Sequence, residues 1–228
     1  MLAYRASAAA ALRALVDALQ STRPLDDVLA ELLSQVRAFL AADEAYVLLL
    51  QGDVMVVRAA DGLPPGEVGR ALDRHRGLEG AAATVRQTVV VIDAARHRLY
   101  ADPFGRRAQP GAFVATPMLV RGRESGLLVA ARHSPGEFTD ASIWWLELLA
   151  GLAAVVVVQD EAVRFQEQRA RQAELLLGLA EAGPDEPGRF LGQLAATIRQ
   201  GLPADDITLL LHDPERGELL AAATLGDQ

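Results

Sequence analysis

A loop-like stretch between residues 93 and 113 carries several charged side chains that could hold a small ligand. Arg106 and Arg107 each offer a planar guanidinium, which can hold a carboxylate or phosphate through two parallel hydrogen bonds. Arg96 and Asp93 add one charge of each sign nearby in the sequence. The same residues would also suit a solvated basic loop, so a site for an anionic ligand is one of two interpretations.

Three aromatic side chains flank these charges. Tyr100, Phe104 and Phe113 could stack on a planar ligand, because an aromatic ring combines a large apolar surface with a specific packing geometry. They could equally pack the loop against a neighbouring sheet. The candidate ligand-binding residues from these patterns are Asp93, Arg96, Tyr100, Phe104, Arg106, Arg107 and Phe113.

The chain lacks residue types that several kinds of site require. It has no cysteine, so it cannot form a disulfide, a thiolate metal site or a thioether-linked cofactor. It also has no lysine, which rules out Schiff-base chemistry. His75, Asp93 and His97 are spaced too irregularly to predict a metal site, and a turn before a helix explains His133 and Ser134 better than a catalytic triad does. We therefore expect no catalytic residue, no metal site and no enzymatic activity.

The overall charge and hydropathy limit the partners and the location. The 228 residues carry a formal net charge of −8, which argues against a general nucleic-acid-binding surface. Charged residues interrupt residues 1–20, so they do not form a secretion signal. The most apolar run, residues 148–158, is shorter than the ~20 residues that a membrane-spanning helix needs. We expect a cytoplasmic protein without a membrane span.

Hydrophobic periodicity predicts helices near both ends of the chain and β-hairpins between them. Apolar residues recur at helical spacing in residues 6–20 and 24–40. Because hairpin-linked strands lie between terminal helices, we expect an α+β domain with an antiparallel sheet. The terminal helices would cover one face, and the insert of residues 61–112 would cover the other. The predicted strands are residues 45–50, 54–59, 88–92, 113–120 and 125–131, with short insert helices at residues 67–75 and 81–87.

The longest uninterrupted pattern, residues 140–182, predicts one helix that leaves one domain and enters another. Thr139 or Asp140 can cap its start, and Gly183-Pro184 is a strong stop signal. At ~1.5 Å per residue such a helix would be about 63 Å long. Its first half is apolar on two sides, and its second half is charged with a narrow apolar seam. Two interpretations stay open: a buried terminal helix with a charged linker, or a dimer seam as in a coiled coil.

Part of the sequence matches itself after a shift of 162 residues. Residues 28–49 align without a gap on residues 190–211, and a turn and a strand follow in both copies. The shared order of helix, acidic pair, strand, turn and strand indicates a tandem array. The second copy ends after one hairpin, so we expect a piece of a longer protein or a sheet that is completed by a partner. Identical pairs include Leu29/Leu191, Leu32/Leu194, Arg37/Arg199, Leu40/Leu202, Asp43/Asp205, Leu48/Leu210 and Leu49/Leu211.

Several short motifs, taken in order, resemble the GAF family of sensory domains. The strongest match is the strand around Val114-Ala115-Thr116-Pro117-Met118-Leu119-Val120, followed by Gly122 and by Gly126 with its apolar successors. No single motif is specific, but the order and spacing are. The other matching segments are Gly77-Leu78-Glu79-Gly80, Thr88 to Asp93, Asp102-Pro103-Phe104 and Phe138-Thr139-Asp140.

The resemblance implies a GAF-like, PAS-like fold: a six-stranded antiparallel sheet with the terminal helices on one face and a ligand-covering insert on the other. It adds Thr116 and Arg132 to the candidate ligand-binding residues, and Arg132 could pair with Asp140. It also implies a domain layout. We expect an N-terminal helix over residues 1–22, a GAF-like domain over 23–160, a helical linker over 161–183 and an incomplete second GAF-like domain over 184–228.

Some functions found in the family do not suit this chain. Covalent bilin attachment and free methionine sulfoxide reduction need cysteine, and the cyclic-nucleotide signature needs asparagine and lysine, none of which occurs here. The loop before the strand at Phe113 has no histidine, which argues against haem. We expect a sensory domain of a bacterial signal-transduction protein. It would bind an unidentified small molecule, dimerise through its terminal helices and signal to an output domain outside this chain. The alternative is a ligand-free dimerisation and transmission module.

Overall fold

The computed structural model of the chain describes residues 13, 23–105, 110–181, 191–192, 194–196, 198–199, 206–213 and 216–225. The chain divides into two compact units, residues 1–161 and 162–228, which are described separately. The helix predicted over residues 6–20 lies outside the described residues, apart from Arg13.

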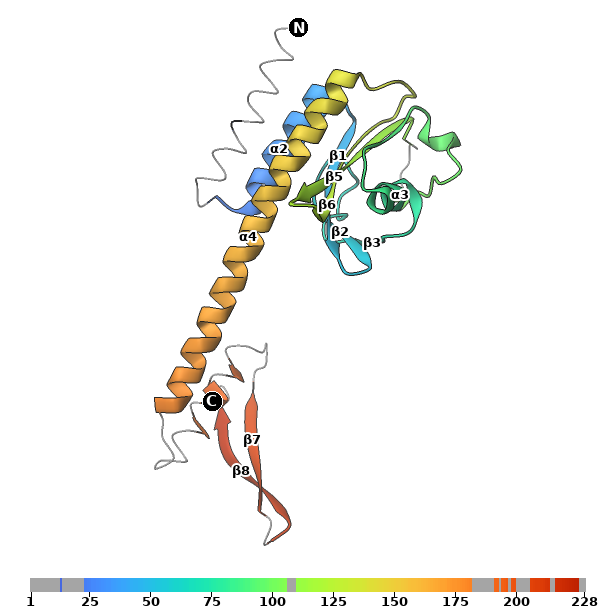
Figure 1. The fold of residues 1–228 in the computed structure, drawn as a ribbon. Helices are drawn as coiled ribbons and strands as arrows, with labels where there is room; N and C mark the ends of the chain where they lie inside the picture. Colours follow the sequence, from blue (N-terminus) through green and yellow to red (C-terminus); the bar gives the residue numbers. More distant parts are fainter. Residues whose placement is uncertain are drawn as a thin grey trace. The chain divides into compact units, whose positions relative to one another are not determined.

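The first unit is built on a six-stranded antiparallel sheet with the strand order β3-β2-β1-β6-β5-β4 (Figure 1). The predicted α+β class and antiparallel sheet are therefore confirmed. The helix predicted over residues 67–75 is wrong, because residues 71–73 form an edge strand too short to show a strand period. The strands are β1 (Glu44–Gln51), β2 (Val54–Asp61), β3 (Ala71–Asp73), β4 (Val89–Val91), β5 (Ala112–Val120) and β6 (Arg123–Arg132).

Helices α2 (Leu25–Leu40) and α4 (Asp140–Glu181) cover one face of this sheet (Figure 1). Their apolar stripes form the helix-side core with alternate residues of the strands, and Phe39 packs edge to face on Trp145. The Thr139 hydroxyl accepts a hydrogen bond of 3.2 Å from the Ser142 backbone N–H, so the predicted cap is confirmed. The single long helix is also confirmed, with its end at Glu181.

The other face of the sheet is covered by what we call the roof: α3 (Gly77–Val85), the short 3-10 helix η1 (Ala94–Arg96) and residues 97–104. Apolar residues of the roof pack on the strands in a second, roof-side core. One sheet thus separates two cores, as the sequence predicted. Members of the roof-side core include Leu78, Phe104, Phe113, Leu127 and Val129.

Arg132 ties the end of β6 to the helix layer. Its Nε donates a hydrogen bond of 3.0 Å to the Leu40 carbonyl at the end of α2, and its Nη1 donates one of 3.3 Å to the Glu137 carbonyl. The guanidinium also lies 4.4 Å from the centre of the Phe138 ring. The sequence predicted such a tie through Asp140, but the partners in the structure are backbone carbonyls and an aromatic ring.

Part of α4 has the composition of a membrane-spanning helix. Residues Asp140–Ala173 are long and apolar enough to cross a membrane, judged by length and composition alone. Several of these apolar residues, including Leu146, Leu149 and Val157, are buried in the helix-side core. Packing on the sheet therefore accounts for much of this apolar character. The absence of a membrane span stays a prediction.

The second unit contains a two-stranded antiparallel sheet of β7 (Ile207–Asp213) and β8 (Glu218–Leu225). The described positions between residues 191 and 199 are helical, which is the helix–hairpin order of the predicted repeat. The predicted domain boundaries stay predictions.

Two arginines that flank α3 tie the roof to the turn between β5 and β6. Arg74 lies before α3 and forms an ion pair with Glu124 at 3.5 Å, and Arg86, after α3, donates a hydrogen bond to the Gly122 carbonyl. The Glu124 side chain is only 4% exposed, and its oxygens accept no hydrogen bond from the described residues. Burial raises the pKa of the Glu124 carboxyl, and Arg74 and Arg86 oppose this rise.

We predict that Glu124→Gln changes the pH dependence of stability. A carboxyl whose pKa is raised by folding contributes stability below its ordinary pKa, near 4.5, and loses it as the pH rises through the folded value. The thermal midpoint of the wild type should therefore fall relative to that of Glu124→Gln as the pH increases from about 4 to 7. Glu137→Gln, an exposed control, should show no such trend. A difference in midpoint that is constant with pH would contradict the prediction.

Candidate functional site

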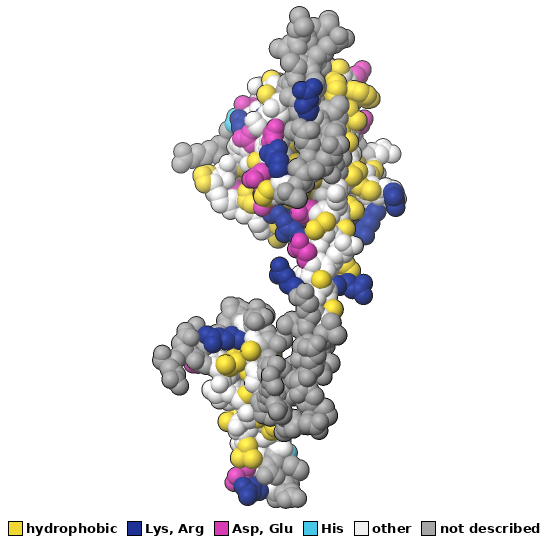
Figure 2. Space-filling view, turned by 90° about the vertical axis from the view of Figure 1, so that its left-hand side faces the viewer, with side chains coloured by type: hydrophobic (Ala, Val, Ile, Leu, Met, Phe, Trp, Pro, Cys, Tyr) yellow, Lys and Arg dark blue, Asp and Glu magenta, His cyan; other side chains and the backbone are white. Residues whose placement is uncertain are grey.

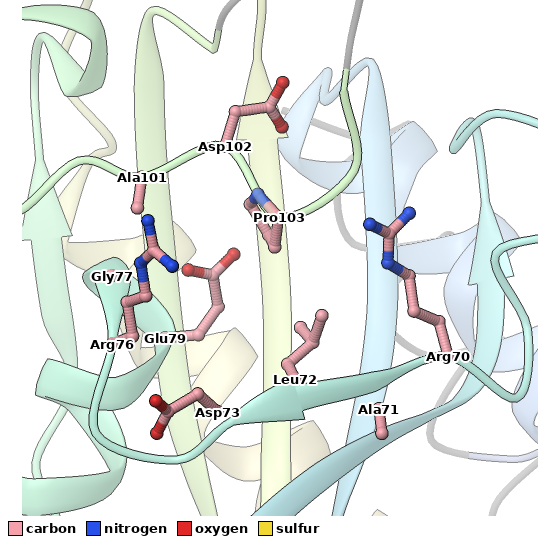
Figure 3. Close-up of a pocket in the computed structure, with 10 residues that line it drawn as sticks. All are labelled: Arg70, Ala71, Leu72, Asp73, Arg76, Gly77, Glu79, Ala101, Asp102 and Pro103. Atoms are coloured by element: carbon pink, nitrogen blue, oxygen red, sulfur yellow. The ribbon is translucent and has the colours of Figure 1, made fainter.

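A hollow of about 270 Å³ opens on the roof side of the sheet, between β3, the start of α3 and residues 101–103 (Figure 3). Three short segments from different parts of the insert meet there. Their side chains differ in charge, with two arginines and three acidic residues around a small apolar floor. The lining residues are Arg70, Ala71, Leu72, Asp73, Arg76, Gly77, Glu79, Ala101, Asp102 and Pro103.

Glu79 brings a buried carboxylate to this hollow. It lies in the first turn of α3, where the helix dipole favours a negative charge, and it is only 4% exposed. The hydroxyl of Tyr46, a fully buried residue of β1, donates a hydrogen bond of 2.7 Å to its Oε1. The Tyr46 ring also packs edge to face on Phe104 at 5.3 Å. Tyr46 therefore links the wall of the hollow to the centre of the sheet.

The position of α3 depends on two glycines. A Cβ on Gly80 would lie 2.7 Å from the Arg74 carbonyl oxygen, so the helix can approach that strand end only with glycine. Gly77 has a φ of +79°, a backbone conformation that residues with a side chain rarely adopt. These glycines hold Glu79 at the hollow. The Gly77–Gly80 motif therefore shapes the candidate site.

The other charged side chains that line the hollow differ in whether they already form hydrogen bonds or ion pairs. Asp73 and Asp102 accept hydrogen bonds from the backbone N–H groups of His75 and Phe104, at 2.8 and 3.0 Å. Arg70 pairs with Glu67 at 2.9 Å. Arg76 is exposed, and its side chain forms no hydrogen bond or ion pair with the part of the chain that the structure describes, although its backbone bonds to Asp73 and Gly80. Figure 3 shows its guanidinium and the Glu79 carboxylate pointing toward the 101–103 segment.

This arrangement suits a small ligand that carries both charges. The uncommitted guanidinium of Arg76 can hold a carboxylate, and the carboxylate of Glu79 can accept hydrogen bonds from an amine or hydroxyl. The volume lies just below the ~300–1,000 Å³ typical of pockets for drug-sized ligands. A ligand smaller than a nucleotide or a haem fits this volume best. Within the described residues, no cluster of three or more histidine or acidic side chains could hold a metal ion.

The predicted ligand-binding residues that the structure describes do not line this hollow. Phe104 and Phe113 are buried in the roof-side core, and Tyr100 packs against it. Asp93 and Arg96 form an ion pair at 3.5 Å on the surface of the roof, where the Arg96 side chain is 89% exposed. None of these five lines the hollow. The predicted Arg106 and Arg107 lie outside the described residues.

Thr116 and Arg132 lie away from this hollow. The Thr116 hydroxyl, which is buried, lines a second, more open hollow beside α4 and lies 3.4 Å from the Thr88 hydroxyl. Thr88 in turn donates a hydrogen bond of 2.6 Å to Glu147 of α4. Arg132 bonds to the Leu40 carbonyl on the helix side of the sheet, as described above. The structure therefore does not bring either residue to the roof-side hollow.

Sequence reasoning missed Tyr46 and Glu79, although a signal for each was present. Tyr46 is a polar residue inside an otherwise apolar strand, and a buried hydroxyl needs a hydrogen-bond partner. Glu79 stands in the apolar first turn of a helix, between two glycines. Neither signal predicts that the two residues contact each other, because they lie 33 positions apart in the sequence.

Comparisons with known proteins agree with this fold. A family model described as a GAF domain matches residues 22–158, and no match was found among curated proteins. The GAF domain of a phosphoenolpyruvate-protein phosphotransferase from Acinetobacter is 26% identical, with a TM-score of 0.61 over 67% of this chain and 93% of that domain. The corresponding domain from Coxiella burnetii is 21% identical, with a TM-score of 0.61 over 68% and 96%.

One of the similar structures is that of an enzyme. Free methionine-R-sulfoxide reductase from Neisseria meningitidis, solved in complex with its substrate, is 18% identical, with a TM-score of 0.55 over 64% of this chain and 85% of that one. At this identity the likeness concerns the fold alone. The family model covers more than half of the chain, and its limits include α2, the six-stranded sheet and the first part of α4, which continues to Glu181. The chain therefore belongs to the GAF domain family, whose members serve as sensory and signalling modules.

Proposed function

We propose that this GAF domain senses a small molecule in the roof-side hollow. The single observation that carries the proposal is the pairing of an uncommitted guanidinium, Arg76, with a buried carboxylate, Glu79, in one small hollow. Groups of opposite charge in one hollow favour a small zwitterion, such as a free amino acid, over an anion alone. The absence of cysteine argues against the reductase chemistry named for the Neisseria protein. We therefore propose binding without catalysis.

Ligand binding would reach α4 through the sheet. Tyr46 joins Glu79 to β1, and the neighbouring residues Val47 and Leu49 of β1 point into the helix-side core. Because packed cores resist continuous deformation, a shift of the roof would move the strands and the α4 residues packed on them together. We propose that α4 carries this change toward further domains.

The exposed side of α4 supports a homodimer. An outward-facing set of mostly apolar residues follows alternating steps of four and three, the spacing of a coiled-coil seam. Trp144, Val155 and Phe165 are large exposed members of this seam, at 57%, 40% and 58%. We propose that a second copy packs along it. The seam residues are Trp144, Leu148, Gly151, Val155, Val158, Ala162 and Phe165.

A ligand-free transmission module is the second candidate function. It is favoured by the tight packing under the roof, where Phe104 and Phe113 are almost fully buried. In that case the hollow would have no occupant, and the helices alone would carry the signal. For either function we propose a cytoplasmic bacterial protein in which a second GAF-like domain begins near residue 184.

We predict that a small zwitterion raises the thermal midpoint of the full chain. A series of free amino acids at millimolar concentration should include one that stabilises, by about 2.7 kcal/mol at a hundredfold excess over Kd. Arg76→Gln should weaken its binding about 10- to 100-fold, since a hydrogen bond to a charged group contributes about 1.5–3 kcal/mol. Arg121→Gln, at an exposed turn, should bind normally. No stabilisation by any amino acid would favour the ligand-free module, and equal loss of binding in both variants would contradict the placement of the ligand in the roof-side hollow.

We predict that Val155→Glu converts the dimer to a monomer, because a charge in the seam would lose its water on association. Val163→Glu is the matched control: Val163 is a similarly exposed valine of α4, at 48%, but it lies off the seam. Sedimentation equilibrium should show a monomer for the first variant and a dimer for the second. A monomeric wild type, or dimers of both variants, would refute the seam.

A further inference from the structure

The seam of α4 continues past Phe165 with two polar residues. The alternating steps of four and three place Arg169 and Gln172 next on the same side of the helix, and both are exposed. Helix α4 runs without a break to Glu181, so these residues extend the seam. In Figure 2, arginine side chains (dark blue) stand out from the exposed part of α4. The mostly apolar layers of the seam are therefore followed by a charged layer and an amide layer.

This order of layers favours a parallel, in-register pair of helices. In such a pair each seam residue faces its own copy, so apolar layers meet apolar layers and Arg169 meets Arg169. An antiparallel pair that matches Val155 with Val158 would instead set Arg169 opposite Trp144 and separate the like layers. A polar residue in a seam commonly fixes the register in this way.

The seam offers Arg169 no carboxylate on its own helix. Side chains three and four positions apart share one face of a helix, and none of those four neighbours of Arg169 is acidic. The nearest acidic residue in the sequence, Glu167, lies about 200° around the helix, because each residue turns an α-helix by ~100°. The four neighbours are Phe165, Gln166, Gln172 and Ala173.

The second copy would not supply a carboxylate either. In a parallel pair, a side chain at the position of Arg169 fits between four residues of the facing helix, here residues 165, 168, 169 and 172. These are a phenylalanine, two glutamines and the other arginine. Two guanidinium groups therefore face each other at one layer, and like charges that meet across an interface weaken it.

The side chains around this layer suit an anion. The Arg169 guanidinium lies 5.7 Å from the centre of the Phe165 ring, so it is held along the seam toward the preceding layer. An open hollow of about 540 Å³ borders it. Amide groups, which can donate hydrogen bonds, and two small alanines line this hollow together with the arginine. The lining residues are Gln166, Arg169, Ala170, Gln172 and Ala173.

We propose that a small oxyanion such as phosphate binds between the Arg169 side chains of two copies in the dimer. Each guanidinium can donate two parallel hydrogen bonds to the oxyanion, and the Gln172 amides can donate further ones. The anion would join the two like-charged groups and so strengthen the dimer. The site is incomplete in a single copy, and the inference rests on the proposed dimer. Because the site lies between two helices, a free ion fits it better than a bulky phosphate ester.

Sedimentation equilibrium of the full chain tests this site. The dimer Kd is measured in sodium chloride, in sodium phosphate and in chloride with AMP, at one pH and one ionic strength. Arg169→Gln removes the charge from the seam. Arg171→Gln is the matched control, because Arg171 is also an exposed arginine of α4 but lies off the seam. Phosphate strengthens apolar association in general, and the Arg169→Gln variant measures that general effect.

We expect phosphate to lower the dimer Kd of the wild type and of Arg171→Gln at least about tenfold, as hydrogen bonds to a charged group require. Arg169→Gln should lose this response and should dimerise more tightly than the wild type in chloride. An equal response in Arg169→Gln, or tightening by AMP without tightening by phosphate, would overturn the proposed ion site. A dimer that ignores phosphate would overturn the site alone, whereas monomers of all three proteins would overturn the site and the seam together.

Discussion

The hydrogen bond between Tyr46 and Glu79 joins the two layers on which this domain depends. Strand β1 contributes alternate side chains to both cores, so a displacement of its centre changes the packing on both faces of the sheet. The Tyr46 hydroxyl also donates a hydrogen bond of 2.7 Å to one oxygen of the Glu79 carboxylate, which is almost fully buried. An unsatisfied buried carboxylate is costly, so this bond constrains both α3 and the hollow beside it.

This constraint makes the domain suitable for transmitting a signal. The hollow lies between β3, the start of α3 and residues 101–103, while α4 packs on the opposite face of the same sheet. A ligand that bridges Arg76 and Glu79 would bias the position of α3, and the sheet would pass that bias to α4. In the proposed dimer, the outward seam of α4 would let a second copy respond to this change.

The sequence predicted the fold better than the site. Helical spacing in residues 24–40 and 140–182 and the hairpin patterns identified the elements and layers, because these depend on local periodicity. The site depends on contacts that local periodicity does not reveal. Strand β3 is only three residues long, Glu79 meets Tyr46 from 33 positions away, and Arg132 reaches a carbonyl 92 positions away. Arg106 and Arg107 of the predicted basic loop lie outside the described residues, so their role stays a prediction, and the described lining of the hollow comes from β3, the start of α3 and residues 101–103.

Hydrogen exchange of Tyr46→Phe tests the coupling of the two faces most directly. The substitution removes one hydroxyl and keeps the ring that packs on Phe104. We predict faster exchange both in α3 and in the part of α4 that is packed on the sheet, residues 140–157, compared with the wild type. Faster exchange in α3 with an unchanged α4 would contradict the account, because the roof would then move without any effect on the helix that is proposed to carry its signal.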